Sequence, residues 1–152
     1  FISHPSGDEG DAYLAALLRK AQQQHVEIIL ADRLLAAAGQ GADMLWGAYR
    51  CADLVTYPSL IEGFGNALLE ALYFRKPLVV NRYPVYEADI RPLGFDLIEI
   101  QGAVDEKVVK EVIAVLSDER RRMQMVEKNY SIAAAHFSYQ AIRPKLDKMM
   151  GL

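Results

Sequence analysis

The chain has 152 residues, of which 52% are hydrophobic, and this composition suffices for one domain with a sizeable core. The formal net charge of −3 leaves no basic footprint for nucleic acid, which we exclude as a partner, and no apolar run approaches the roughly 20 residues of a membrane span. Cys51 is the single cysteine, which excludes an internal disulfide and suits a reducing compartment. We therefore expect a cytoplasmic protein in which Cys51 packs in the core.

The first third of the chain predicts two helices around one strand. Residues 11–24 carry apolar side chains on one helical face, after acidic residues that favour a helix start. Residues 26–31 are mainly apolar and predict a short buried strand, and Asp43 is placed to cap a helix over residues 44–52. Residues 1–3 predict the end of a strand, and because the first residue is phenylalanine we expect the chain to be a fragment of a longer protein.

A strand, a glycine turn, a helix and a second strand follow. The first strand, residues 53–57, is β-branched and aromatic and stops at a proline, and the second, residues 77–81, begins with another proline. Between them, apolar residues recur at three- and four-residue steps, which predicts a helix from about residue 66 to residue 74 with its apolar side on the sheet. This order is a βαβ unit, so we expect an α/β fold with a parallel sheet.

Two glycines mark a candidate anion site where the chain leaves the first strand and enters the helix. Gly63 and Gly65 let backbone amides approach a ligand that a Cβ would push away, and a helix start carries positive partial charge, so we expect a phosphate there. Glu62 and Glu70 flank this point and can accept hydrogen bonds from pairs of hydroxyls, which predicts a nucleotide sugar. The alternative is structural, because glycine turns occur in many α/β folds and a glutamate often only complements the helix dipole.

The rest of the chain predicts a peripheral strand and then helices. Residues 95–100 alternate as a strand does, the chain is helical from Asp105 onward, and Ser138 is the expected cap of the last helix. The loop 81–87 leaves the second strand on the presumed ligand side. Its side chains are candidates for ligand contacts and are equally explained as a rigid, proline-bounded loop, so we leave them out of the predicted site. We interpret the arginines at 120–122 as a solvated helix face.

The glycine turn and its surroundings closely resemble the signature of a known family. The resemblance is to the retaining glycosyltransferases of family 4, also called glycosyl transferases group 1. It rests on four stretches, namely Pro58-Ser59, Glu62-Gly63-Phe64-Gly65, Leu69-Glu70-Ala71 and Lys76-Pro77-Leu78-Val79-Val80. It implies that residues 1–152 are the nucleotide-sugar-binding C-terminal domain of a GT-B enzyme, a Rossmann-like doubly wound parallel sheet that lacks its first strand-helix unit.

The resemblance also implies roles for individual residues. Glu62 binds sugar hydroxyls and acts in catalysis, Glu70 binds the ribose, and amides near Gly65 bind the sugar or the diphosphate. The expected donor site comprises Glu62, Gly63, Phe64, Gly65, Asn66, Ala67 and Glu70. In the family, the loop after the strand predicted at 26–31 approaches the nucleotide base, so Arg33 and Leu34 are the base-side candidates. An ordinary solvated arginine is the other interpretation of Arg33.

Two short stretches depart from the family pattern. Tyr73-Phe74-Arg75 stands where the family usually has a small residue and a glycine before Lys-Pro, and Asn66-Ala67 replaces a commoner pair. Neither change removes a backbone donor, so both bear on which sugar is bound more than on whether one is bound.

The implied function is transfer of a glycosyl group from a nucleotide sugar to an acceptor, with retention of configuration. We expect the fragment alone to be inactive, because the family's diphosphate-binding arginine and lysine and most of its acceptor pocket belong to segments that this sequence lacks. No cofactor and no metal is implied. A non-catalytic sugar-nucleotide-binding module is the alternative. A dinucleotide-dependent oxidoreductase is disfavoured, because the available turns lack Gly-x-Gly-x-x-Gly with a downstream acid. The donor sugar, base and acceptor stay open.

Overall fold

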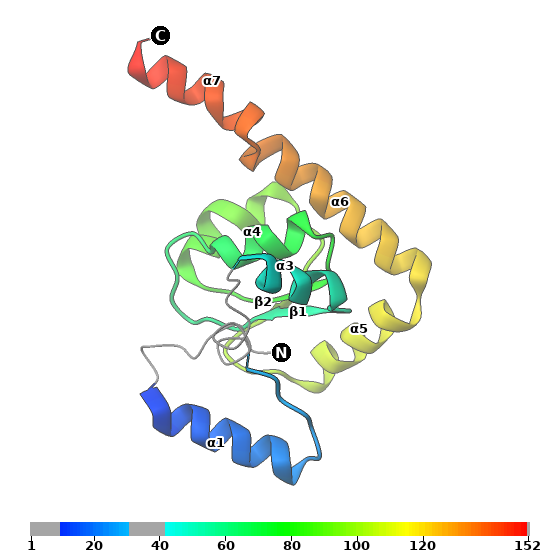
Figure 1. The fold of residues 1–152 in the computed structure, drawn as a ribbon. Helices are drawn as coiled ribbons and strands as arrows, with labels where there is room; N and C mark the ends of the chain where they lie inside the picture. The colour runs from blue at the N-terminus through cyan, green and yellow to red at the C-terminus, as the bar shows by residue number, and fades with distance from the viewer. Residues whose placement is uncertain (1–9, 31–41, 152) are drawn as a thin grey trace. The chain divides into compact units, whose positions relative to one another are not determined.

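The computed structural model describes residues 10–30 and 42–151 of the chain. The chain divides into two compact units, Phe1–Cys51 and Ala52–Leu152 (Figure 1), and the second unit holds the sheet and most of the predicted donor site. The single domain expected over residues 1–152 stays a prediction.

Two helices are described in the first unit. Helix α1 spans Gly10–Gln23 and helix α3 spans Ala42–Cys51, which confirms the predicted pair. Along α1, Ala21 is buried and Tyr13 at the other end of the predicted apolar face is exposed. The strand end predicted for residues 1–3 lies outside the described residues.

Two predictions for the first unit are wrong. The segment predicted as a buried strand at 26–31 shows no strand pairing over residues 26–29, and Val26 and Ile29 are 58% and 40% exposed. Of residues 26–30, which the structure describes, Leu30 alone is buried and forms a bridge. A segment rich in β-branched residues becomes a strand only where a neighbouring strand pairs with its backbone. The composition of residues 26–31 was therefore not sufficient to predict a strand. Cys51, expected in the core, is exposed at the end of α3.

The second unit contains a three-stranded parallel sheet. Its strands are β1 (Val55–Tyr57), β2 (Leu78–Asn81) and β3 (Ile98–Ile100), and they lie side by side in the order β1-β2-β3. Helix α4 (Asn66–Tyr73) connects β1 to β2 and contacts both strands. The predicted βαβ unit and peripheral strand are therefore confirmed, and the fold is a Rossmann-like α/β arrangement.

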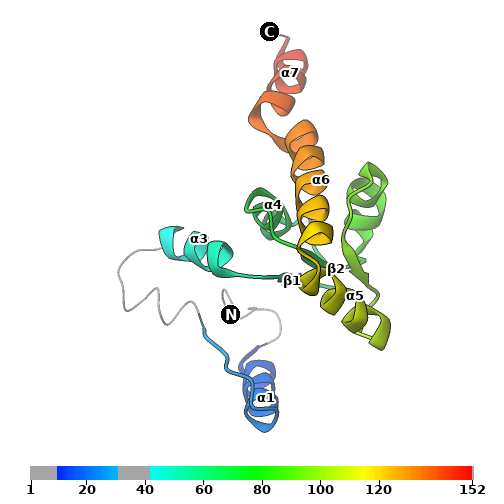
Figure 2. The same cartoon turned by 90° about the vertical axis from the view of Figure 1, so that its right-hand side faces the viewer.

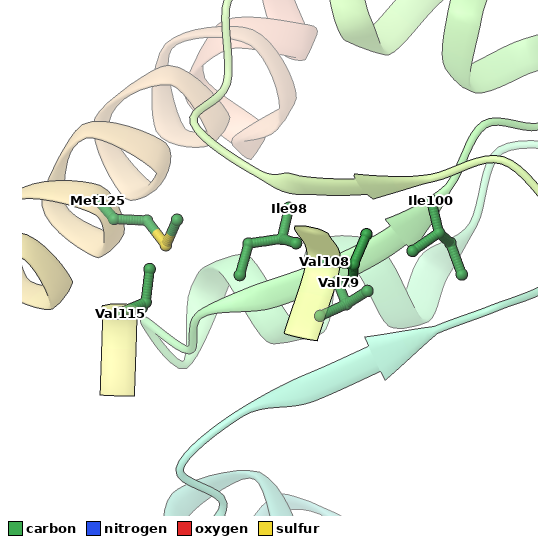
Figure 3. Close-up of a cluster of buried hydrophobic side chains, with 6 residues drawn as sticks. All are labelled: Val79, Ile98, Ile100, Val108, Val115 and Met125. Atoms are coloured by element: carbon green, nitrogen blue, oxygen red, sulfur yellow. The ribbon is translucent and has the colours of Figure 1, made fainter. Parts of the chain in front are cut away.

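Helices cover both faces of this sheet, as predicted for a doubly wound fold. Helices α5 (Glu106–Ser117) and α6 (Glu119–Phe137) complete a buried cluster on one face (Figure 3), formed by Val79, Ile98, Ile100, Val108, Val115 and Met125. Because side chains alternate along a strand, the buried Leu78 and Val80 point to the other face, where α4 contacts β2. Figures 1 and 2 show α4 and α5 on opposite sides of the strands.

Each of the three C-terminal helices begins at a capping side chain. Asp105, Asp118 and Ser138 precede α5, α6 and α7 (Tyr139–Met150), and each accepts a hydrogen bond from the backbone N–H three residues later, at 2.8, 3.0 and 3.2 Å. Such caps satisfy N–H groups that the first turn leaves unpaired, and the cap predicted at Ser138 is confirmed. Within residues 10–30 and 42–151, no helix combines the length and the apolar character needed to span a membrane.

Polar side chains of α6 fix the chain just before β3. The buried Asn129 side chain accepts from the Asp96 N–H at 2.7 Å and donates to the Asp96 carbonyl at 2.6 Å. The Arg121 guanidinium binds both Asp96 carboxylate oxygens, at 2.6 and 2.8 Å. Arg122 donates to the Leu116 carbonyl at 3.1 Å. The interpretation of these arginines as a solvated face is therefore wrong for two of the three.

Candidate functional site

Gly65 stands at the start of α4 in a conformation that other residues rarely adopt. Its φ of 95° and ψ of 72° lie in the left-handed region. A Cβ at this position would lie 2.8 Å from the Tyr83 hydroxyl and 3.2 Å from the Tyr57 hydroxyl, too close for any side chain. A Cβ at Gly63 would meet no atom within 4 Å. Of the two glycines in the predicted turn, Gly65 is therefore the one that the local geometry requires.

The N-terminus of α4 carries no capping side chain, because its capping residue is this glycine. The first intrahelical hydrogen bonds run from the N–H groups of Leu68 and Leu69 to the Gly65 carbonyl, at 3.0 and 3.4 Å. Asn66 and Ala67 occupy the first two helical positions. First-turn N–H groups and the helix dipole together favour an anion, so this end of α4 has the chemistry expected of a phosphate site.

Glu62 lies beside two tyrosine hydroxyls. Burial, and then a hydrogen bond to the Glu62 carboxylate, raise the pKa of Tyr57 well above its ordinary value. Burial, and then the charge of Glu62, raise the pKa of Tyr83 to about 12. Both phenols are therefore protonated at neutral pH and available as donors. Because Tyr57 ends β1 and Tyr83 follows β2, the carboxylate lies at the carboxyl ends of parallel strands, where ligands bind in open α/β sheets.

Asn81, the last residue of β2, and Tyr83, two residues later, hold the loop between β1 and α4, and the sequence-based prediction left both out of the site. The fully buried Tyr83 donates its hydroxyl to the Phe64 carbonyl at 3.0 Å. The buried Asn81 side chain donates to the Ser59 carbonyl at 3.0 Å and accepts from the Gly102 N–H at 2.8 Å. We call Tyr57, Tyr83 and Asn81 the hydroxyl and amide network. Polar residues directly after a strand on the ligand side were the signal that could have revealed them.

Phe64 is held by a second contact, from the end of α6. Its ring meets the Phe137 ring edge to face, with centroids 5.2 Å apart. Phe137 in turn stacks on Phe95, with centroids 6.5 Å apart. Edge-to-face and offset-stacked geometries are the favoured arrangements of aromatic pairs. The end of α6 therefore stabilises the loop through the Phe64 ring, in addition to the hydrogen bond at the Phe64 carbonyl.

The structure does not place the other predicted site residues in this group around the two tyrosines. Glu70 lies in the second turn of α4, half-buried, about 200° around the helix from the buried Leu68 and so away from the sheet. Arg33 and Leu34, the base-side candidates, lie outside the described residues. The structure thus gathers Glu62, Phe64 and Gly65 around the two tyrosines, with Asn66 and Ala67 opening the adjoining helix.

A second polar group, the ion cluster, consists of Arg82, Glu87, Arg91 and Glu99. The Arg91 Nε lies 3.0 Å from Glu99 Oε1, Arg82 pairs with Glu87, and the Tyr86 hydroxyl donates to Glu99 at 2.8 Å. The hydrogen bond from Arg82 is the main cause that lowers the pKa of Glu87, and the bond to Glu99 raises the pKa of Arg91. A cavity of about 450 Å³ adjoins the cluster. Its arginines are already paired with carboxylates, so it is poorly suited to bind a phosphate.

The chain resembles known proteins over most of its length. The glycosyl transferases group 1 family profile matches residues 18–132. The mannosylglucosylglycerate synthase of Thermotoga maritima is 30% identical over 153 residues, which cover 92% of this chain and 35% of that protein. The mannosylglucosylglycerate synthase of Petrotoga mobilis is 38% identical over 103 residues, which cover 66% of this chain and 24% of that protein.

A third relative is more distant. The lipopolysaccharide 1,2-N-acetylglucosaminetransferase of Salmonella typhimurium is 24% identical over 148 residues, which cover 93% of this chain and 38% of that protein. The chain therefore spans between 24% and 38% of the length of these relatives. No solved structure matches the chain.

Proposed function

The chain belongs to the glycosyl transferases group 1 family, and on this premise we propose that it binds a nucleotide sugar and that the full-length protein transfers the glycosyl group to an acceptor with retention of configuration. The observation that carries the proposal is the uncapped N-terminus of α4 beside Glu62. An anion and a set of hydroxyls are recognised there side by side, which is the chemistry of a sugar diphosphate.

In this proposal, each residue of the site binds a different part of the donor. The N-terminal end of α4, which begins at Asn66, binds the diphosphate through its dipole and the Asn66 amide. Glu62 accepts hydrogen bonds from sugar hydroxyls, and Glu70 accepts them from the ribose. An ionised carboxylate is an acceptor with about four lone-pair positions, so Glu62 can take one hydrogen bond from Tyr57 and still bind a hydroxyl pair.

Catalysis in this proposal rests on electrostatic stabilisation. Positive charge develops at the anomeric carbon as the diphosphate leaves, and the hydrogen bonds of a fixed, negative Glu62 strengthen as it does. The helix dipole of α4 stabilises the departing diphosphate. We propose no cofactor and no metal for this step, since the positive partial charge at the N-terminus of α4 already opposes the charge of the departing diphosphate.

The relatives' names suggest the class of donor. They are named for the synthesis of a mannosyl product and for the transfer of N-acetylglucosamine. We propose that this chain likewise takes a hexose ester of a nucleoside diphosphate. A cytoplasmic location belongs to the same proposal, because nucleotide sugars are cytoplasmic metabolites in general and the exposed free thiol of Cys51 suits a reducing compartment.

Calorimetry on the full-length protein tests the proposal. Nucleoside diphosphates would be titrated beside their mannose, glucose and N-acetylglucosamine esters, with wild-type protein and with Glu62→Ala and Glu70→Ala. Glu70→Ala should weaken the diphosphate and its ester alike by about 1.5–3 kcal/mol, and Glu62→Ala should weaken only the ester by a similar amount. Glu106→Ala, which removes an exposed ion pair with Lys110 in α5, is the matched control. A wild-type protein that binds none of these ligands would refute the proposal, and binding without transfer to any acceptor would favour the non-catalytic module.

A further inference from the structure

We propose that Tyr57 and Tyr83 are positioning residues for the transfer reaction, because their hydroxyls together fix the loop from Glu62 to Gly65 in the shape that presents one carboxylate and one helix N-terminus to the same ligand. This inference rests on the proposed function and assigns it two residues beyond the family signature. Neither tyrosine needs to touch the donor. Each acts through the loop residue that it holds.

The two rings form a pair above a single glycine. Tyr57 and Tyr83 come from the ends of neighbouring parallel strands, and their rings meet edge to face with centroids 6.1 Å apart at 75°. The position of a Cβ on Gly65 would lie 2.8 Å from one hydroxyl and 3.2 Å from the other. Both hydroxyls therefore converge on the residue that begins α4, and only a residue without a side chain can pass beneath them.

The two hydroxyls hold different parts of the loop. Tyr83 donates to the Phe64 carbonyl at 3.0 Å, which fixes the backbone immediately before Gly65. The Tyr57 hydroxyl lies 3.2 Å from the position that a Cβ would take on Gly65, and the Glu62 carboxylate interacts with it, since Glu62 is, after burial, the next cause that raises the pKa of Tyr57. Tyr83 is fully buried, and removing its hydroxyl would take this donor away from the Phe64 carbonyl.

A purely structural role makes a different prediction. If the tyrosines only fill space, Tyr→Phe variants should keep the loop and the activity, since the ring and its contacts remain. If the hydroxyls position the loop, the same variants should release it while the fold persists. The chain offers a matched control in Tyr86, which is also buried and also donates to a carboxylate, that of Glu99 in the ion cluster.

The experiment compares Tyr57→Phe, Tyr83→Phe and Tyr86→Phe in the full-length protein. It measures kcat and KM for the donor that calorimetry identifies, and amide hydrogen exchange in the peptide spanning residues 58–66. Tyr57→Phe and Tyr83→Phe should each lower kcat by roughly tenfold to a hundredfold with a smaller change in KM, the pattern of a group needed mainly in the transition state. Tyr83→Phe should also speed exchange in the loop. Tyr86→Phe should leave kcat and loop exchange within about twofold of wild type.

Two results would overturn the inference. One is kcat and loop exchange that stay within about twofold of wild type in both site variants. The other is a loss of kcat in Tyr86→Phe as large as that in Tyr57→Phe. Failure of the proposed function is a separate outcome, since it would show as a wild-type protein that binds no nucleotide sugar. Hydrogen exchange, which needs no ligand, would then decide alone whether the hydroxyls hold the loop.

Discussion

The segment after β2 contributes to two polar regions, and they are built from different chemistry. In the hydroxyl and amide network, neutral donors meet backbone carbonyls and one carboxylate, that of Glu62. In the ion cluster, the guanidinium of Arg91 lies 3.0 Å from the carboxylate of Glu99, which also accepts from Tyr86. The first region fixes a loop, and the second joins charged side chains to one another.

The difference indicates where a ligand can bind. A carboxylate paired with a guanidinium has its charge compensated and its lone pairs occupied, so Glu99 has little left to offer. A carboxylate held by a phenol keeps its full charge and most of its acceptor positions. The cavity beside the ion cluster is therefore less suited to a nucleotide sugar than the surroundings of Glu62, where the neighbouring tyrosine hydroxyls are neutral.

The largest expected effect comes from removing the glycine under the tyrosine pair. Gly65→Ala would place a Cβ 2.8 Å from the Tyr83 hydroxyl at a φ of 95°. We expect it to destabilise the protein by about 2–4 kcal/mol, from left-handed strain and overpacking together, and to abolish donor binding. Urea unfolding measures the first effect. Gly63→Ala is the control and should change stability by less than about 0.5 kcal/mol, since that position is open; equal effects at the two glycines would contradict the geometry.

Exchanging charge for an amide in each region should separate catalysis from stability. In the full-length protein, Glu62→Gln keeps the shape and one acceptor but loses the charge, so if the proposed function holds, kcat should fall by roughly a hundredfold with a smaller change in donor KM. Glu99→Gln should leave kcat within a few-fold and lower the stability instead. Steady-state kinetics and thermal unfolding of both variants measure this. A kcat of Glu62→Gln close to that of wild type would contradict a catalytic role for Glu62.

Alkaline pH should weaken the hydroxyl and amide network. The pKa of Tyr83 is raised from 10.0 to about 12, so the stabilisation is complete below pH 10 and is lost as the pH rises from 10 to about 12. Glu62→Gln should lower that pKa by the smaller part of its shift, because burial is the larger cause and the charge of Glu62 the smaller. Phenolate absorbance during an alkaline titration, with unfolding followed in parallel, measures both. If the Tyr83 pKa in Glu62→Gln equals that in wild type, the Glu62 carboxylate does not act on the Tyr83 hydroxyl.

The smallest expected effect lies in the ion cluster. Arg91 is about half exposed, so Arg91→Gln should lower stability only slightly, and salt should reduce that difference further. Tyr83→Phe removes a neutral hydrogen bond, and its destabilisation should not depend on salt. Unfolding at low and high ionic strength measures both variants. A strong salt dependence for Tyr83→Phe would mean that the two regions do not differ in kind.

Local patterns sufficed for the elements that local interactions define. The helix predicted from residue 66 to residue 74 is α4, Asn66–Tyr73, because its apolar spacing and the glycine before it are readable over one short stretch. The cap at Ser138 was predictable for the same reason. The strand predicted at 26–31 was not, because a strand depends on a partner elsewhere in the chain, and composition alone does not supply one.

The site was half predictable. Glu62 and Gly65 belong to one continuous signature, and the structure places them together. Tyr83 and Asn81 form hydrogen bonds with backbone carbonyls that lie 19 and 22 residues earlier in the chain. The sequence does not show whether a tyrosine bonds to such a distant carbonyl or only contacts residues of its own loop. Sequence reasoning left those two interpretations of the loop 81–87 open, and only the fold decides between them.

Asn81 makes the shape of the site depend on the whole sheet. Its amide joins the Ser59 carbonyl, ahead of the glycine turn, to the Gly102 N–H that follows β3. In a chain that has formed only the first two strands and α4, the acceptor end of that amide lacks its Gly102 partner, so we expect the native loop to form only when β3 joins the sheet. A shorter polypeptide that ends before β3 would contain every residue of the family signature, and we expect it to lack the loop geometry that the complete sheet provides.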